Sequence, residues 1–349
     1  MLVWIVACVL LSSALGRDVP PRVYELNVHR RSLRPQGKIY HHDKSDYDRI
    51  TVPLHIGSDR QEGDFLVNTI GADLEVVLCP DPRGTHECFN YTQSVTYESK
   101  SSNTAMDSVS DAWGAMMPNI TFGIVTQLPS FAGRLGLGWP SLSKYPGASF
   151  ASHFLSNLPQ MFSMRLGEVW GGAMQFGANE ICFPKQKAPH WVPATSKSYW
   201  QFAIDGVRLG RSKKVFRAHA VVDTTTEYIG MPKKILSQFV SQYNITWDGL
   251  YGAYTVDYDV ARGMPAFEVM VDGATLQIPA ALYVNWRKPL PNERCVVNFE
   301  DSAAYGFGPD WYFGFEILSS YCMTFDFDNS RIGFTDINGA VAPIPPRIQ

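Results

Sequence analysis

Short stretches of alternating apolar and polar residues recur along the chain from residue 47 onward. Arg49–Gly57 and Trp200–Val207 alternate in this way, and residues 265–284 form an apolar, turn, apolar pattern around Asp272-Gly273. A period of two is typical of β-strands with one buried face, and Asp-Gly between two such runs is a strong hairpin signal. Residues 322–334 follow the same pattern with a polar tip. The sequence therefore predicts a mostly β protein made of short strands and hairpins.

Helical periodicity is limited to two segments. Ser149–Leu158 is the most helix-like part of the first half of the chain. In the second half, Pro232–Tyr243 places Ile235, Phe239 and Val240 on one face, as in an amphipathic helix. We therefore expect helices to form a minor part of the fold.

Two apolar runs end in the same way, one in each half of the chain. The run that ends at Val67 is followed by Asn68-Thr69, and the run that ends at Val222 is followed by Asp223-Thr224. The two polar pairs are about 155 positions apart, which is the length of one domain. This repeat predicts two lobes with a site between them.

The repeat also suggests where the lobes divide. We place an N-terminal β lobe at residues 47–194 and a C-terminal β lobe at residues 195–349, which ends in a Pro-rich tail. Hydrophobic residues make up 45% of the 349 residues and charged residues 18%, so the chain has the material for large packed cores. The net charge of −3 lacks the basic footprint of a nucleic-acid-binding protein, and that class is excluded.

The first 46 residues differ from the rest of the chain. An apolar run from Leu2 to Leu11 precedes small residues at Ala14 and Gly16, a pattern that predicts a signal peptide over residues 1–16. The run is too short to span a bilayer, so we expect a secreted, extracellular protein that is not attached to a membrane. Residues 17–46 are polar and basic. They are interpreted as a solvated arm, a metal-binding His41-His42 pair or a residual propeptide-like arm, and adjacent histidines are a poor metal site without further ligands.

Export makes disulfide bonds and glycosylation relevant. Cys8 leaves with the signal peptide, so the mature chain keeps an odd number of cysteines, and at least one of them lacks an intramolecular partner. Three Asn-x-Thr sequons predict surface glycosylation sites at Asn90, Asn119 and Asn244.

Several segments in register resemble one family, the secreted pepsin-like aspartic peptidases. The resemblance covers about residues 47–337. Its landmarks are the two active-site loops, the glycine-rich segment between them, the strand that opens the second lobe and the closing region: Leu66–Thr69, Val221–Thr224, Phe131–Gly138, Tyr199–Phe202 and Trp311–Phe334.

The resemblance implies a bilobal pepsin-like acid-protease fold, in which two pseudo-twofold-related β lobes enclose a central cleft that binds a peptide or protein. It implies a monomer with no cofactor and no bound metal. It also implies a Cys79–Cys88 disulfide after the first loop. A Cys182–Cys322 disulfide is our further hypothesis, and it leaves Cys295 outside both pairs.

The family hydrolyses peptide bonds with two carboxylates that share one proton across a bound water, as in pepsin. At the first of these positions the chain has Asn68, whose amide has no titratable proton, so Asp223 is the remaining dyad member. The residues after the loop threonines are Ile70 and Thr225, where the family has glycine, and both are expected to resist unusual backbone angles. The family's Asp in the glycine-rich segment is replaced by Ala132.

The hairpin that covers the cleft in this family allows two interpretations. Tyr97 belongs either to the tyrosine-bearing strand of that hairpin or to the surface loop before it, and in the second case the hairpin is shortened. We favour the shortened hairpin. The residues expected to line the cleft are Thr69, Ile70, Thr224, Thr225 and Tyr97.

Three hypotheses for function follow from the sequence. The first is a secreted, non-catalytic family member that binds a ligand in the cleft. The second is a residual aspartic endopeptidase that uses Asp223. The third is a structural or storage protein, which rests only on secretion and glycosylation. Without the resemblance, Asp223 is more simply explained as a turn residue whose carboxylate accepts local N–H groups.

Overall fold

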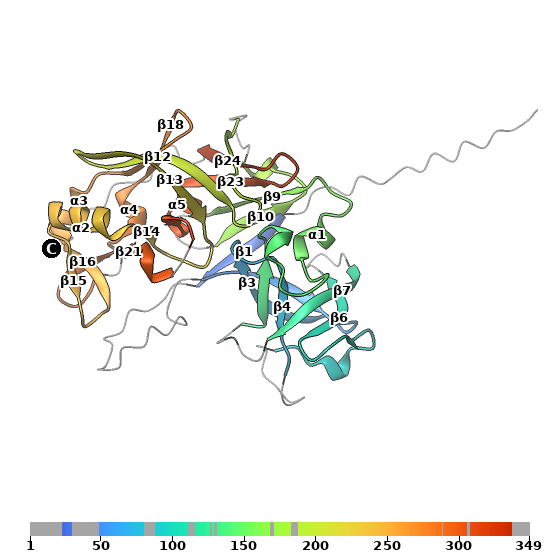
Figure 1. Ribbon diagram of the computed structural model, residues 1–349. Helices are drawn as coiled ribbons and strands as arrows, with labels where there is room; N and C mark the ends of the chain where they lie inside the picture. Colours follow the sequence, from blue (N-terminus) through green and yellow to red (C-terminus); the bar gives the residue numbers. More distant parts are fainter. Residues whose placement is uncertain are drawn as a thin grey trace, which may run out of the picture.

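The computed structural model describes residues 23–29, 49–79, 88–110, 116–125, 128, 131–167, 171–182, 188–287, 289–305 and 308–336. The chain folds into two β lobes (Figure 1). The strands β1, β3, β4, β6 and β7 lie in one lobe, and β12–β21 with helices α2–α4 lie in the other, while β9, β10, β23 and β24 lie between them. This is the bilobal β architecture that the sequence predicts.

The largest sheet among the described residues has thirteen strands and runs from the N-terminal lobe into the region between the lobes. Its order is β11-β24-β23-β9-β10-β1-β2-β3-β8-β4-β7-β6-β5. Its strands are β1 (Val23–His29), β2 (Arg49–Ile56), β3 (Gln61–Asn68), β4 (Leu74–Val77), β5 (Glu98–Ser99), β6 (Thr104–Ser110), β7 (Met116–Val125), β8 (Gly133–Gly136), β9 (Met161–Leu166), β10 (Gly172–Phe176), β11 (His190–Pro193), β23 (Tyr321–Asp326) and β24 (Arg331–Asp336).

Two further sheets build the C-terminal lobe. Over the described part of the chain, one has seven strands in the order β18-β17-β12-β13-β22-β14-β21 and the other has four in the order β15-β16-β20-β19. The strands are β12 (Gln201–Leu209), β13 (Ser212–Val222), β14 (Ile229–Met231), β15 (Thr246–Asp248), β16 (Ala253–Asp257), β17 (Phe267–Val271), β18 (Ala274–Ile278), β19 (Val284–Asn285), β20 (Arg294–Val297), β21 (Phe299–Asp301) and β22 (Trp311–Phe313).

Helices in the described residues are short. They are α1 (Phe150–Phe154), α2 (Lys233–Gln242), α3 (Tyr258–Arg262), α4 (Ala280–Tyr283) and α5 (Phe315–Ser320), with 3-10 turns at Tyr91–Gln93, Pro140–Leu142, Glu180–Cys182 and Ser302–Tyr305. The periodicity predicts α1 and α2 but not α3, α4 and α5. Helix α2 matches the expected amphipathic segment and buries Phe239. Helix α1 is shorter than expected, because the chain turns after Leu155. No helix among the described residues is long and apolar enough to cross a bilayer.

The predicted hairpins are confirmed. β17 and β18 are joined by Asp272 and Gly273, which both have positive φ angles of 45° and 76°. This is the conformation that the Asp-Gly signal favours in a two-residue hairpin turn. The Phe325-containing hairpin is formed by β23 and β24. Local turn chemistry therefore determines these elements.

Both expected disulfides are present. Cys79 is bonded to Cys88 across 9 positions, and Cys182 is bonded to Cys322 across 140 positions. The second bond connects the 3-10 turn after β10 to β23 and so joins distant parts of the chain at the central sheet. Cys295 belongs to neither bond and is buried on β20, opposite Val256.

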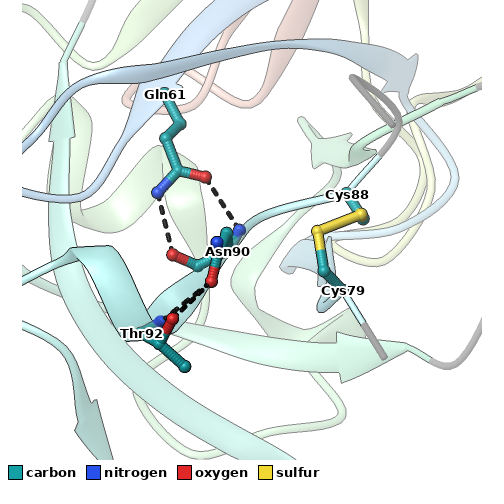
Figure 2. The surroundings of a disulfide bond; sticks show 5 residues. All are labelled: Gln61, Cys79, Cys88, Asn90 and Thr92. Carbon is teal, nitrogen blue, oxygen red and sulfur yellow. Dashed lines mark hydrogen bonds between the residues drawn. A yellow bond between two sulfur atoms is a disulfide. The ribbon is translucent and has the colours of Figure 1, made fainter. Parts of the chain in front are cut away.

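One of the three sequons differs from the expected surface site. Asn90 is only 8% exposed, and its Oδ1 accepts hydrogen bonds from the N–H and hydroxyl of Thr92 at 3.2 and 2.7 Å. Its backbone N–H and C=O also form hydrogen bonds with the amide of Gln61 beside the Cys79–Cys88 disulfide (Figure 2). The prediction of a surface residue is therefore wrong at Asn90, because this side chain caps a turn. Asn119 and Asn244 are exposed.

The basic arm is not wholly solvated. Val23–His29 forms β1, which lies between β10 and β2 and pairs with both. Tyr24 is 5% exposed, and its ring meets Phe154 and Phe176 edge-on at centroid distances of 6.2 and 5.5 Å. The solvated-arm interpretation is therefore wrong for this stretch. The signal peptide, His41, His42 and the Pro-rich tail lie outside the described residues.

We expect Tyr24→Ala to lower the free energy of unfolding by about 3 kcal/mol, since it removes a large buried ring from an aromatic cluster. Urea unfolding followed by tryptophan fluorescence measures the change. The matched control is Val23→Ala, at the neighbouring position of the same strand, where the side chain is 39% exposed and the effect should be small. Equal stability of the Tyr24 variant and the native chain would contradict the placement of β1 in the sheet.

Candidate functional site

Each of the two similar loops follows a strand whose last apolar residue is buried where the lobes meet. β3 pairs in parallel with β8, and β13 pairs in parallel with β22. Val67 and Val222, the last apolar residues before the loops, are 1% and 0% exposed. The two equivalent loops that follow these strands therefore face each other.

The loops are joined by four reciprocal hydrogen bonds. The N–H of Thr69 donates to Oγ1 of Thr224 at 3.0 Å, and the N–H of Thr224 donates to Oγ1 of Thr69 at 3.1 Å. The Thr69 hydroxyl donates to the Val222 carbonyl at 2.8 Å, and the Thr224 hydroxyl donates to the Val67 carbonyl at 2.7 Å. We call this arrangement the Thr69–Thr224 network.

The network fixes the loops firmly because it is buried. Thr69 is 0% and Thr224 is 1% exposed, so a broken bond would leave a polar group without water to replace its partner. A second link between the lobes lies beside it. The indole N–H of Trp200 donates to the Leu137 carbonyl at 2.8 Å, and the Leu137 N–H donates to the Asn68 carbonyl at 2.8 Å. Asn68 and Asp223, which directly precede the two threonines, are therefore held in equivalent positions.

Asn68 uses its side chain to close the first loop. Its Oδ1 accepts a hydrogen bond from the Ile70 N–H at 3.0 Å, and the residue is half-buried. Gly71 leaves space for the amide, since a Cβ at this position would lie 2.7 Å from Nδ2 of Asn68. The amide nitrogen of Asn68 supplies N–H donors where a carboxylate would supply acceptors only.

Asp223 closes the second loop in the same way, with one more donor. Its Oδ1 accepts hydrogen bonds from the Thr225 N–H at 2.8 Å and from the Thr225 hydroxyl at 2.7 Å. The Asp223 residue is 0% exposed. Two donors therefore face one carboxylate oxygen of Asp223. The first loop has no equivalent hydroxyl, since the residue after Thr69 is Ile70.

The backbone of these loops bears on one expectation from the sequence. Neither Ile70 nor Thr225 has a positive φ, and the non-glycine residues that do are elsewhere in the chain. The loops turn through the short hydrogen bonds to Asn68 and Asp223 and need no left-handed residue at these positions. Unusual backbone angles, which β-branched residues are expected to resist, therefore do not occur at these two positions.

The buried phenol of Tyr312 lies close to Asp223, and the sequence pattern did not single it out. Tyr312 on β22 is 6% exposed, and Asp223 donates its backbone N–H to the next residue on that strand, Phe313, at 3.0 Å. Burial raises the pKa of the Tyr312 phenol, and the negative charge of Asp223 raises this pKa further. The phenol therefore stays protonated as a donor. The one signal in the sequence for a tyrosine at this place was its position in the closing aromatic segment of the family pattern.

Tyr97 lies outside the covering hairpin. In the described residues the hairpin after the first loop is formed by β6 and β7, with Ser110 opposite Met116. Tyr97 precedes it and packs on Tyr91 and Phe89 at centroid distances of 5.0 and 6.3 Å. The interpretation of Tyr97 as part of the hairpin strand is therefore wrong, and its position is that of the upstream loop. Its role in lining the cleft stays a prediction.

Ala132 is built into the core where β8 begins, beside Asp64 of β3, which is four positions before Asn68 of the first loop. It is 5% exposed and its N–H donates to the Asp64 carbonyl at 3.0 Å. A Cβ added at Gly63 would lie 2.5 Å from the Ala132 side chain, so the two small residues pack directly on each other. The family's Asp at this position has been replaced by a residue that contributes packing alone.

The fold and the two linked loops define a pepsin-like aspartic peptidase architecture. In agreement with it, the family described as eukaryotic aspartyl protease matches residues 51–337, and the chain belongs to this family. The pepsin-like protease domain that defines this family binds peptide substrates in a cleft.

Curated relatives show the same relationship. The chain is 27% identical to aspartic protease 1 of Caenorhabditis elegans over 322 residues, which is 80% of each chain. It is 26% identical to gastricsin of Callithrix jacchus over 314 residues, 80% of this chain and 79% of gastricsin. It is also 30% identical to aspartic protease 17 of Caenorhabditis elegans over 211 residues, 58% of this chain and 54% of the relative.

The substitution Thr224→Val should lower the free energy of unfolding by about 2 to 5 kcal/mol, because it leaves the Thr69 N–H and the Val67 carbonyl without partners. Chemical denaturation monitored by circular dichroism tests this. Thr324→Val is the matched control, since Thr324 is 0% exposed and its hydroxyl forms no hydrogen bond with any described residue. A Thr224 variant as stable as the Thr324 variant would show that the network contributes nothing to stability.

Proposed function

We propose that this chain is a secreted, non-catalytic pepsin-like protein that binds a peptide or protein segment in the cleft between its lobes. The observation that carries the proposal is Asn68, an amide at the position of the first catalytic carboxylate, in a loop otherwise held like its partner. The chemistry of the family needs one group to take a proton from water while another donates one. An amide performs neither step.

The remaining groups suit binding. A peptide bond presents one C=O acceptor and one N–H donor. The half-buried Asn68 offers an amide N–H to a ligand carbonyl, whereas the buried Asp223 holds the second loop in place through Thr225. The proposed cleft residues Thr69, Ile70, Thr224 and Thr225 belong to the same two loops, and the Thr69–Thr224 network keeps both loops in place before a ligand arrives. Such preorganisation lowers the entropic cost of binding.

Secretion is part of the proposal. The apolar run and small residues of segment 1–16 support export, and the two disulfides support an oxidising compartment. Asn119 and Asn244 are the sequons whose exposure supports glycosylation. We further propose that the protein is a monomer with its lobes at residues 47–194 and 195–349.

A second candidate is a residual endopeptidase that uses Asp223 with another acid or base. It is favoured by Asp223 itself, which keeps the hydrogen bonds from Thr225 at 2.8 and 2.7 Å. Loss of one member of a cooperating catalytic set commonly lowers kcat by roughly 10⁴-fold or more. The two candidates therefore predict different rates of peptide-bond hydrolysis, which can be measured.

Incubation of the purified protein with unfolded globin between about pH 2 and pH 7 distinguishes the candidates. We expect no cleavage above background at any pH, because the proton-sharing pair is absent. Peptide products are measured by mass spectrometry, with and without pepstatin, and a related active peptidase serves as the positive control.

Cleavage that pepstatin inhibits and that Asp223→Ala abolishes would overturn the proposal in favour of the second candidate. The double substitution Asn68→Asp with Ile70→Gly then measures how much peptidase activity is restored. We expect little activity from it, because the covering hairpin would still differ from that of the family.

A further inference from the structure

The hairpin of β12 and β13 has a concentration of positive charge that the cleft does not explain. Residues 208–217 contain five Lys and Arg residues, and residues 206–222 contain no Asp or Glu. The whole chain, by contrast, has a net charge of −3. The pair forms a long outer element of the C-terminal lobe (Figure 1).

Lys213 and Arg217 lie on the outer face of the sheet, with Arg208 opposite Lys213, whereas Lys214 is half-buried on the other face. Exposed and half-buried residues alternate along β13, so that Lys213, Val215, Arg217 and His219 point outward. Phe216 points to the opposite face, where its ring stacks on Trp311 at a centroid distance of 5.7 Å. Alternate residues of a strand lie about 7 Å apart, so the outward residues form a row along β13, which a bulge interrupts between Val215 and Ala218.

Most of these charges lack a partner. Arg208 forms an ion pair with Glu268 on β17. The side chains of the other four form no ion pair and no hydrogen bond within the described part of the chain; these are Arg211, Lys213, Lys214 and Arg217. Asp205 on β12 is the remaining carboxylate of the hairpin, and it forms no ion pair with them. The row therefore keeps a net positive charge.

The arrangement also costs stability. Arg208 and Lys213 are directly opposite each other across the antiparallel pair. Like charges in this position destabilise a sheet. An anionic ligand along the row would relieve this repulsion.

We propose that the outer face of the β12–β13 hairpin binds a linear sulfated polysaccharide. Clusters of Lys and Arg in short segments are typical of heparin-binding patches, and a narrow row of cations along one hairpin matches a chain-like polyanion. A membrane surface would favour a broader basic face with several exposed apolar anchors, whereas Val215 alone is an exposed apolar residue among the outward residues of this row. Single-stranded nucleic acid would favour outward aromatic rings, and the aromatic residue of this strand, Phe216, stacks inward.

Binding of the full chain to fluorescent heparin, measured over a range of salt concentrations, tests this proposal. The triple variant Arg211→Ser, Lys213→Ser and Arg217→Ser should weaken binding. It should also reduce the slope of log affinity against log salt by about three, one for each cation removed. The matched control is Lys233→Ser, Lys234→Ser and Arg262→Ser, which removes the same charge from exposed positions on α2 and α3 and should leave both values unchanged.

Equal weakening in both triple variants would overturn the proposal, because binding would then follow net charge alone. So would the absence of heparin binding, or binding to vesicles of phosphatidylserine and phosphatidylcholine with none to heparin. Urea unfolding of both variants confirms that they are folded. The outcome is independent of the peptidase assay, since the substituted residues lie outside the cleft loops.

Discussion

The Thr69–Thr224 network is the interaction on which the rest of the structure depends. Each threonine donates its hydroxyl to the strand that precedes the other threonine and accepts the other's backbone N–H. All of these groups are buried, so the bonds form together or leave several unsatisfied polar groups in the interior. This reciprocity explains why two loops 155 positions apart keep matching conformations while their neighbours diverge.

The two loops differ most in the side chain that closes each of them. Asp223 receives a backbone N–H and a hydroxyl from Thr225, whereas Asn68 receives only the N–H of Ile70. The loop scaffold has thus been retained, and the pair of carboxylates that it holds in active relatives has become one carboxylate and one amide. Binding to a peptide group depends on donors and acceptors in fixed places, and proton transfer depends on titratable groups. We propose that this site meets the first requirement and does not meet the second.

How much of this was predictable from the sequence depends on the range of the interactions. The strands, the Asp272-Gly273 hairpin and α2 follow from local patterns, and the sequence predicted them correctly. The two lobes followed from the repeated loop and from the family resemblance, the Cys79–Cys88 pair followed from the resemblance, and the Cys182–Cys322 pair was our further hypothesis. The burial of Asn90 and the place of β1 between β10 and β2 depend on contacts with distant segments, which no local pattern records. The sequence also did not show that the first loop accommodates Ile70. This loop is closed by a hydrogen bond from the Ile70 N–H to the Asn68 side chain and needs no glycine at position 70.

The central claim is that the cleft holds peptides and leaves them intact. Equilibrium dialysis of the protein against a random peptide library, followed by mass spectrometry of the retained peptides, tests it directly. The account predicts that a selected set is retained at full length, and that Asp223→Ala weakens its retention. Recovery of shortened peptides that share a newly formed terminus would contradict it, as would a retained set that is identical for the native chain and the Asp223 variant.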